Sequence, residues 1–346
     1  MTVKTAVMIC GHGSRDDAAI SEFNKLSGHL KARLPDFDVE SGFLEFALPV
    51  IRTGLEKLKA RGAGRIVCLP GMLFAAGHVK NDLPSEVNEF GAENPAIEML
   101  YGRDLAIDAR LLDAARDRIE AAERASTRKI PRQDTLLMVV GRGTNDPDAN
   151  SNVAKVARML WEGMGFGWAE VSFSGVARPL VDAGLAQAVK LGFRRIIVFP
   201  YFLFTGILVR RIYDWADQAA ALDPNVEIVK ASYLNDHAKV IDTFVDRVTE
   251  ALAGDANMNC SLCKYREQII GYEKDKGQPQ VGHHHHVRGV GTDGHGAADR
   301  GVHHGHHHGH DHHHDHGHDH GHDHGHDHGH DHGHGHDHRP GEEDPA

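Results

Sequence analysis

The feature that most constrains the fold of this chain is an internal duplication. A shift of 130 residues places the first half over the second without a gap through their most informative stretches. The matching pairs are Ala6–Ser14 with Leu136–Thr144, Phe43–Pro49 with Phe173–Pro179, and Arg65–Pro70 with Arg195–Pro200. A repeat of this length predicts two copies of one folding unit, arranged as two similar domains.

Each copy has the pattern of an α/β domain. The short apolar runs 5–10 and 135–140 each end at a glycine, which is typical of strands buried on both faces of a parallel sheet. Further strands are predicted at 39–43, 65–69, 96–100, 171–173, 194–199 and 226–230, and helices at 21–34, 106–125, 152–164 and 238–252. Pro49 and Pro179 are expected in the first turns of helices. Each half is therefore predicted to be doubly wound, with about four parallel strands and helices on both faces.

Changes in composition divide the chain into four segments. A polar stretch at 126–134 separates a first α/β domain, 1–127, from a second, 128–253. Residues 254–282 read as a linker without apolar periodicity. Residues 283–346 consist mostly of Gly, His and Asp and have almost nothing to bury, so we expect this tail to be disordered.

The charge of the chain is concentrated in that tail. Of the formal charge of -11, the tail accounts for -9, and it holds 26 of the 30 His. The near-neutral remainder has no basic stripe, which argues against a nucleic-acid partner. No apolar run approaches the roughly 18 residues of a membrane span, no signal peptide is evident, and four Cys do not make a disulfide framework. We therefore expect a cytoplasmic protein, without a membrane partner, that binds small molecules and metal ions.

Three polar residues follow successive strands of the first half. His12 follows the first strand, Glu45 the second and His78 the third. Ligands of doubly wound sheets bind outside the carboxyl ends of the strands, so these side chains should converge. Two imidazoles and a carboxylate could hold a borderline divalent metal with open coordination positions, or accept protons near neutral pH.

The second half serves as an internal control for this interpretation. At the shifted positions it carries Arg142, Gly175 and Leu208, whereas the glycines and prolines of the scaffold keep identical partners. We therefore predict a functional site in the first half only. The alternative is that each His is a hydrogen-bonded structural residue, which is common at strand ends.

Apolar residues near this site allow two interpretations. Cys10 and Cys68 lie within apolar strands and are expected to be buried packing residues. Met72, Leu73 and Phe74 could line a ligand pocket or fill the core, and their spacing does not separate these alternatives.

Three motifs carry a resemblance to a known family. Gly11–Arg15, Phe43–Ala47 and Leu73–His78 resemble those of the CbiX-type sirohydrochlorin cobaltochelatases, which belong to the ATP-independent tetrapyrrole chelatases. The similarity covers about residues 3–252 and implies the long form, in which two domains are fused and one keeps the active site. Ala76, where relatives often have a second Gly, is a small departure.

The resemblance also implies roles for individual residues. His12 and His78 would be the catalytic residues and the metal ligands, with His12 also accepting protons. Contacts to the substrate, sirohydrochlorin, would come from Glu45, Leu73, Phe74, Ala75, Ala76, Gly77 and His78. Its carboxylates suit guanidinium groups, and the candidates are Arg15, Arg142, Arg178, Arg210 and Arg211. No nucleotide is expected, because the chain has no Gly-x-x-x-x-Gly-Lys-Ser/Thr phosphate loop.

Two metal-related features lie beyond the duplicated halves. Met258–Cys263 resembles a Met-x-Cys-x-x-Cys motif associated with an iron-sulfur cluster in some long members of the family. Cys260 and Cys263 cannot complete a four-Cys cluster alone. A homodimer could share one, other ligands could join, the pair could bind zinc or act as a dithiol, or the thiols could stay unligated. The tail, whose alternative reading is an expression tag, is expected to hold additional divalent metal ions as a native reservoir.

These observations together predict an enzyme that inserts Co²⁺ into sirohydrochlorin on the route to cobalamin. The same reaction with Fe²⁺, giving siroheme, or with Ni²⁺ is the alternative within the class. A metal storage protein or metallochaperone is the alternative from a different class.

Overall fold

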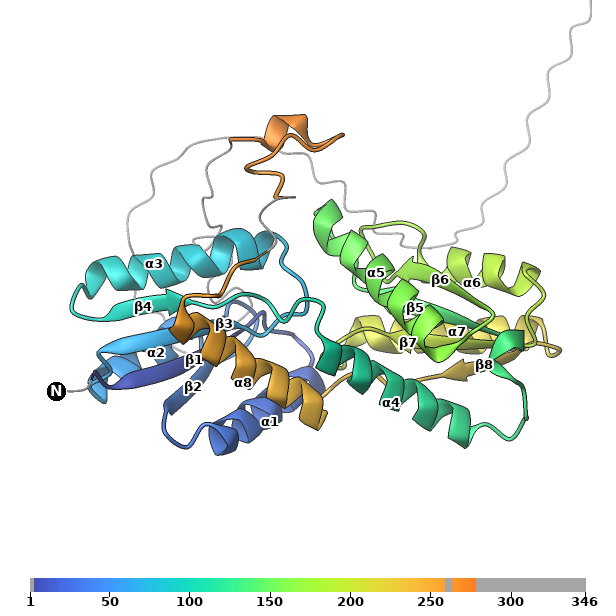
Figure 1. Cartoon of the computed structure of the whole chain (residues 1–346), viewed down its shortest axis with the longest axis horizontal. Helices are drawn as coiled ribbons and strands as arrows, with labels where there is room; N and C mark the ends of the chain where they lie inside the picture. Colours follow the sequence, from blue (N-terminus) through green and yellow to red (C-terminus); the bar gives the residue numbers. More distant parts are fainter. Residues whose placement is uncertain (1–2, 259–262, 278–346) are drawn as a thin grey trace, which may run out of the picture. The chain divides into compact units, whose positions relative to one another are not determined.

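The fold consists of two α/β halves of the same topology. The computed structural model describes residues 3–258 and 263–277, which all belong to one compact unit. Within these residues it contains two four-stranded parallel sheets, each flanked by helices (Figure 1). The predicted fold class and the internal duplication are confirmed.

The first sheet has the strand order β2-β1-β3-β4. Its strands are β1 (Thr5–Gly11), β2 (Asp38–Phe43), β3 (Arg65–Pro70) and β4 (Glu98–Tyr101). On one face, Met8 of β1 packs in a buried cluster with Leu55 of α2 (Ile51–Ala60) and Phe90 of α3 (Leu83–Glu93). The opposite face packs against α1 (Asp17–Arg33) through residues such as Leu26. Both faces of β1 are buried, as its apolar sequence predicts.

The second sheet repeats this arrangement in the order β6-β5-β7-β8. Its strands are β5 (Thr135–Gly141), β6 (Trp168–Phe173), β7 (Arg195–Pro200) and β8 (Glu227–Lys230), and the turn η2 (Arg132–Asp134) precedes them. Its helices are α5 (Pro147–Met164), α6 (Val181–Lys190) and α7 (Ile207–Leu222). The identical strand order means that the carboxyl ends of equivalent strands carry equivalent loops.

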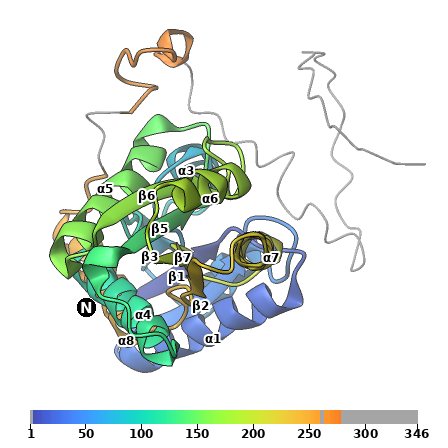
Figure 2. The same cartoon turned by 90° about the vertical axis from the view of Figure 1, so that its right-hand side faces the viewer.

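The last helix of each half packs on the sheet of the other half. Helix α4 (Ala109–Ala125) contacts α5, β7 and β8, whereas α8 (Ala238–Ala253) contacts α1, β3 and β4. The two exchanged helices also contact each other and lie side by side (Figure 2). A packing unit is therefore not a contiguous segment, and the division at 127/128 remains a prediction about the sequence repeat.

The placement of Pro49 and Pro179 in first helical turns was wrong. Helix α2 begins at Ile51 after the N-cap Val50, and α6 begins at Val181 after Leu180. Both prolines follow cis peptide bonds and lie in the preceding loops. In these loops Phe43 N–H donates to Pro49 O and Phe173 N–H to Pro179 O, each at 2.9 Å, so the chain folds back on the end of its strand before the helix starts.

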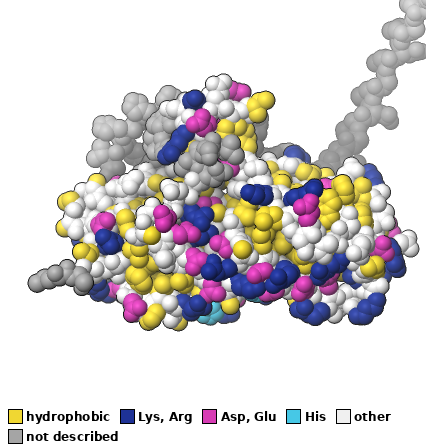
Figure 3. Space-filling model, viewed as in Figure 1, with side chains coloured by type: hydrophobic (Ala, Val, Ile, Leu, Met, Phe, Trp, Pro, Cys, Tyr) yellow, Lys and Arg dark blue, Asp and Glu magenta, His cyan; other side chains and the backbone are white. Residues whose placement is uncertain are grey.

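The surface carries charges of both signs, and the helices are those of a protein without a membrane span in the described residues. In the face seen in Figure 3, Lys and Arg side chains alternate with Asp and Glu, and no patch of a single sign dominates. None of the helices in residues 3–258 and 263–277 is long and apolar enough to cross a membrane.

Candidate metal and tetrapyrrole site

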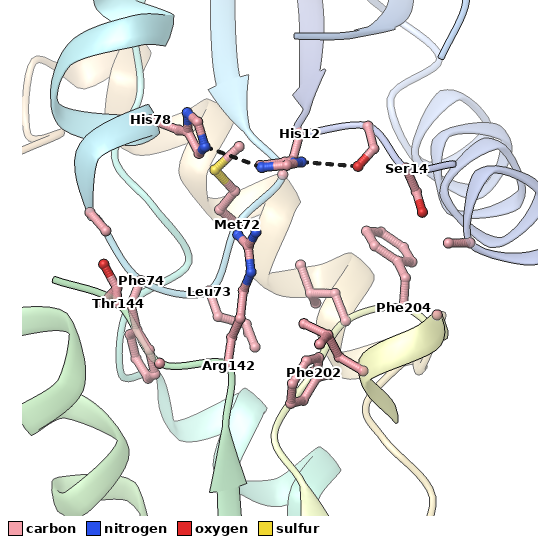
Figure 4. A pocket seen from close by; sticks show the side chains of 18 of the residues that line it. His12, Ser14, Met72, Leu73, Phe74, His78, Arg142, Thr144, Phe202 and Phe204 are labelled. Atoms are coloured by element: carbon pink, nitrogen blue, oxygen red, sulfur yellow. Dashed lines mark hydrogen bonds between the residues drawn. The ribbon is translucent and has the colours of Figure 1, made fainter. Parts of the chain in front are cut away.

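The structure brings the three predicted polar residues together at the carboxyl ends of the first three strands. His12 follows β1, Glu45 follows β2, and His78 is the first residue of the short π-helix η1 (His78–Asp82) after β3. The Nε2 atoms of His12 and His78 are 3.1 Å apart, and His12 Nε2 is 3.3 Å from Glu45 Oε1. One ligand atom from each residue lies within 4.8 Å of the others. Figure 4 shows the two imidazoles facing each other.

Hydrogen bonds set the tautomer of both imidazoles. His12 Nδ1 is 3.0 Å from Gly13 O, and His78 Nδ1 is 2.7 Å from Asp82 Oδ2. A carbonyl or carboxylate oxygen only accepts, so each Nδ1 carries a proton and donates it. Both Nε2 atoms then present lone pairs to each other, an arrangement that requires a shared cation or proton. This is the orientation of histidines that ligate a metal through Nε2 while Nδ1 binds a neighbouring oxygen.

The spacing of the two nitrogens also suits a metal ion. Metal–nitrogen bonds of about 2.0–2.1 Å place neighbouring ligand nitrogens about 2.9–3.4 Å apart for angles of roughly 90–109°. The 3.1 Å between the Nε2 atoms falls in this range. His12 and His78 are therefore spaced as adjacent ligands of one ion, with Glu45 in reach as a third.

A glycine lets the loops that carry His12 and Glu45 pack closely. Gly13 has φ 101°, and a Cβ there would lie 1.7 Å from the carbonyl oxygen of Glu45. A side chain is therefore excluded at Gly13. Its absence lets the two loops come close enough for Glu45 N–H to donate to His12 O at 3.0 Å. Gly143 makes the same approach to Gly175 in the second half, so this glycine belongs to the scaffold.

Burial and neighbouring charges shift the protonation of the site. Burial, with help from Arg142 and His78, lowers the pKa of His12 to about 4. Burial also raises the pKa of Glu45, against the opposing influence of His78 and Arg142. Arg142 is partly exposed to solvent, and the burial of the rest of its side chain lowers its pKa. At neutral pH the His12 imidazole is therefore uncharged and free to bind a cation.

His12 and His78 line a cavity of about 1390 Å³ built by both halves, whereas the buried Glu45 lies behind them and is not among its lining residues. Its lining is largely apolar and includes Leu73 and Phe74 from the first half and Phe202 and Phe204 from the second (Figure 4). In the same view Arg142 extends from the end of β5 toward the imidazoles. An apolar cavity with a few converging polar groups is the usual form of a small-molecule site, and this one is large enough for a macrocycle.

Comparison with known proteins identifies the family. A family model described as CbiX matches residues 6–122 and 136–251, one match in each half. The chain belongs to the CbiX family. A sirohydrochlorin cobaltochelatase from Priestia megaterium is 36% identical over 270 residues, which cover 77% of this chain and 86% of that protein. A sirohydrochlorin ferrochelatase from the same organism is 29% identical over 256 residues, which cover 73% and 92%.

A solved structure agrees with this membership. The sirohydrochlorin chelatase SirB from Bacillus subtilis subspecies spizizenii, in complex with cobalt, superposes with a TM-score of 0.62 at 27% identity. The alignment covers 73% of this chain and 97% of SirB. The CbiX-family fold thus spans both halves of the chain.

In this CbiX-family chain, most of the loop 73–78 faces the cavity. Leu73, Phe74, Ala76, Gly77 and His78 line it, and Met72 does so too, while Leu73 and Phe74 also pack against the core. Both interpretations of the apolar residues therefore hold. Ala75 is not among the lining residues, because its N–H donates to the buried Asp104 Oδ2 at 2.9 Å. Burial raises the pKa of Asp104 to about 6.

The candidate arginines fall into two groups. Arg15, Arg142 and Arg210 line the cavity, and Arg178 and Arg211 are not among its lining residues. The Arg15 guanidinium lies 4.9 Å above the centre of the Phe46 ring. Arg210 pairs with Asp16. Of the three, Arg142 helps to lower the pKa of His12, and both Arg15 and Arg142 oppose the rise in the pKa of Glu45.

Three of the four cysteines lie within the described residues, and all three are buried. Cys10 and Cys68 are fully buried in β1 and β3, which confirms their predicted packing role. Cys263 is also buried. Cys260 and the tail 283–346 lie outside the described residues, so the metal-binding predictions there remain predictions.

Sequence reasoning missed two groups beside the site. Asp82 was signalled only by its spacing of four residues from His78, which places the two side chains on one face of a helical turn. Tyr265 also lines the cavity, but it comes from the segment after α8, and no local pattern marks it. Tyr265 therefore reaches the cavity through tertiary placement alone.

Proposed function

We propose that this chain is an ATP-independent chelatase that inserts Co²⁺ into sirohydrochlorin. The observation that carries the proposal is the pair of inward-facing Nε2 atoms, 3.1 Å apart beside Glu45, in the wall of an apolar cavity. The names of the relatives support the substrate class. The absence of a phosphate-loop motif from the sequence is consistent with a reaction that uses no nucleotide.

Metal insertion exchanges one divalent cation for two protons on the ring nitrogens. His12, His78 and Glu45 supply three ligand atoms and leave coordination positions open for those nitrogens. The lowered pKa of His12 keeps its Nε2 unprotonated at neutral pH, so the proton does not compete with the metal there. The raised pKa of Glu45 makes its carboxylate a better acceptor for a proton leaving the macrocycle.

The remaining lining residues would position the macrocycle. Leu73, Phe74 and Phe202 offer apolar contact to its flat face. Arg15 and Arg142 would pair with carboxylates at its edge, since a guanidinium suits carboxylate recognition. The second half then contributes a binding wall, because its counterpart of His12 is an arginine.

Cobalt is proposed over iron and nickel. The cobaltochelatase is more similar in sequence than the ferrochelatase, at 36% against 29% identity. The His-rich tail is also a better reservoir for cobalt or nickel than for Fe²⁺, by the order of divalent affinities. Two imidazoles and a carboxylate do not themselves distinguish these ions, so the metal must be measured.

The other parts of the proposal rest on the sequence alone. They are a metal reservoir in residues 283–346, an iron-sulfur cluster at Cys260 and Cys263 that two chains of a homodimer would share, and a cytoplasmic location. The 26 His of the tail also support the second candidate function, a metal storage protein or metallochaperone.

Anaerobic spectrophotometry of sirohydrochlorin with Co²⁺, Fe²⁺ or Ni²⁺ separates the two functions. The variants are the His12→Ala, His78→Ala double mutant and a chain ending at Gly282. A chelatase predicts fast metallation by the wild type and the shortened chain, with the double mutant at the spontaneous rate. No acceleration by the wild type with any of these ions, together with extensive metal binding by the tail, would establish the carrier instead.

A further inference from the structure

One wall of the cavity comes from a segment that belongs to neither duplicated half. Residues 263–277, here called the C-terminal strap, follow α8, and Tyr265 of the strap lines the cavity. The family model ends at residue 251, so the strap lies outside both of its matches. Nothing in the duplication therefore assigns a role to Tyr265.

The strap has an internal structure that holds Tyr265 in place. Cys263 and Lys264 are buried, and Lys264 Nζ lies 3.2 Å from Asp275 Oδ2. The same ammonium group lies over the rings of Tyr265 and Tyr272, 5.4 and 5.2 Å from their centres. The strap closes where Gly277 N–H donates to Tyr265 O at 2.9 Å. Tyr265 is thus fixed by several contacts within its own segment.

Tyr265 is joined to the metal-binding side of the cavity through Asn81. Asn81 follows His78 by three residues in η1, and its Nδ2 donates to the Tyr265 hydroxyl oxygen at 2.9 Å. Asn81 is only 6% exposed, also lines the cavity, and its Oδ1 has no hydrogen-bond partner among the described residues. This oxygen is an acceptor, so its missing partner is a donor such as a water molecule, and a carboxylate cannot supply that donor.

The hydrogen-bond donors left at this pair match a carboxylate. The Tyr265 oxygen accepts from Asn81, so its own O–H remains available as a donor. The Asn81 amide carries two N–H donors, and the bond to Tyr265 uses one. Two neutral donors that face a largely apolar cavity can hold one carboxylate without neutralising it.

We propose that Asn81 and Tyr265 form a subsite that binds one peripheral carboxylate of the tetrapyrrole. This inference rests on the proposed function, because it takes a carboxylated macrocycle as the ligand. The subsite would orient the ring relative to His12 and His78. Tyr265 is a substrate-binding residue in this account, and it takes no part in metal ligation or proton transfer.

The test uses the full-length chain and three single variants: Tyr265→Phe, Asn81→Asp and, as a matched control in the same strap, Tyr272→Phe. Tyr272 contacts Lys264 and is not among the cavity residues. The dissociation constant of metal-free sirohydrochlorin is measured from its absorption change, and kcat and KM are measured anaerobically with Co²⁺.

Tyr265→Phe should weaken tetrapyrrole binding about 10- to 150-fold, the typical effect of one hydrogen bond to a charged group, and should raise KM while kcat stays within about twofold. Asn81→Asp should weaken binding further, because it places a second carboxylate against the first. Tyr272→Phe should match the wild type.

Wild-type affinity of Tyr265→Phe, or a fall in its kcat with unchanged affinity, would overturn the subsite while leaving the chelatase intact. A wild-type chain that neither binds nor metallates sirohydrochlorin would overturn both proposals. The two failures are therefore distinguishable in one set of measurements.

Discussion

Asp82 determines which nitrogen of His78 faces the cavity. Its Oδ2 accepts a hydrogen bond from His78 Nδ1, 2.7 Å away. The Asp82 side chain is only 4% exposed, so this hydrogen bond is shielded from water. Such a carboxylate fixes the tautomer and the orientation of the imidazole ring. We therefore propose that Asp82 positions His78 for the metal site proposed above.

Replacement of Asp82 by Asn tests this role. We expect Asp82→Asn to weaken Co²⁺ binding about 10- to 100-fold, because a neutral amide holds the imidazole less firmly. The measurement is calorimetric titration of a chain ending at Gly282, which removes the competing tail. His237→Gln is the control, since His237 is not a cavity residue. Unchanged affinity in Asp82→Asn would mean that the π-helix orients His78 without the carboxylate.

Arg142 acts on His12 through its charge. The guanidinium helps to lower the pKa of His12 to about 4, so Arg142→Gln should let His12 titrate at a higher pH, between about 4 and its ordinary 6.5. In the wild type, the unfolded chain binds this proton near pH 6.5 and the folded chain does not. His12 therefore contributes stability above pH 6.5 that is lost as the pH falls toward 4, and the variant should lose less of it.

Nuclear magnetic resonance of the imidazoles provides the measurement. A chain ending at Gly282 contains only four His, namely His12, His29, His78 and His237, and each can be assigned by substitution. Arg210→Gln is the control, because Arg210 lines the same cavity but does not contribute to the shift of His12. An unchanged His12 titration in Arg142→Gln would show that burial and His78 lower the pKa without help from Arg142.

At the scale of helices and strands, local pattern and one topological rule gave most of the architecture. The apolar run 5–10 predicted a strand buried on both faces. Because ligands bind at the carboxyl ends of parallel strands, the sequence also predicted that His12, Glu45 and His78 lie close together. The exchange of α4 and α8 was not predictable in this way. An amphipathic helix shows that it has an apolar face, and its pattern does not say which sheet that face covers.

Tertiary placement also explains the other omissions. The loop that carries Pro49 is defined by a hydrogen bond back to Phe43, which proline statistics for helices cannot anticipate. Tyr265 reaches the cavity from a segment with no repeat and no periodicity. Residues whose position depends on contacts distant in sequence were the ones missed.

Arg247 anchors the exchanged helix α8 at the crossover between the halves. It is 1% exposed, and its Nε donates to Asp104 O at 3.0 Å, while its Nη1 and Nη2 reach Glu250 and Asp108 at 2.8 and 3.1 Å. These bonds tie α8 to the segment that leads into α4. Removal of the guanidinium would leave the carbonyl oxygens of the buried residues Asp104 and Leu105 without this donor.

We therefore expect Arg247→Met to lower the free energy of unfolding by about 3–5 kcal/mol, as the loss of one partner from a buried ionic network typically does. The control is Arg110→Met, which removes the exposed pair between Arg110 of α4 and Asp246 of α8 and should cost less than about 1 kcal/mol. Urea unfolding monitored by circular dichroism measures both. Equal effects of the two variants would contradict an anchoring role for Arg247.

At the scale of the whole molecule, the two copies share the fold, and only the first carries the polar residues of the proposed site. Each half keeps the sheet order and the Gly13/Gly143 packing, whereas only the first half has the two imidazoles and the carboxylate. Buried contacts join the halves, since Lys80 of η1 lies 2.7 Å from Asp146, the N-cap of α5. One copy can therefore specialise in binding the metal while the other completes the cavity.

The helix exchange leads to a prediction for the isolated first half. A fragment of residues 1–127 lacks α8, so the part of its sheet around β3 and β4 loses a covering helix, while its own α4 has no second sheet to cover. Because α4 and α8 occupy equivalent positions in the two copies, α4 of one fragment can take the place of α8 on another. We expect this fragment to form a homodimer with exchanged α4 helices, measurable as a doubled mass by light scattering after size exclusion.

Deletion of α4 should abolish the dimer, because both exchanged contacts are then lost. A stable, folded monomer of residues 1–127 would mean that α4 can fold back onto its own sheet, and that the exchange depends on the connection between the halves.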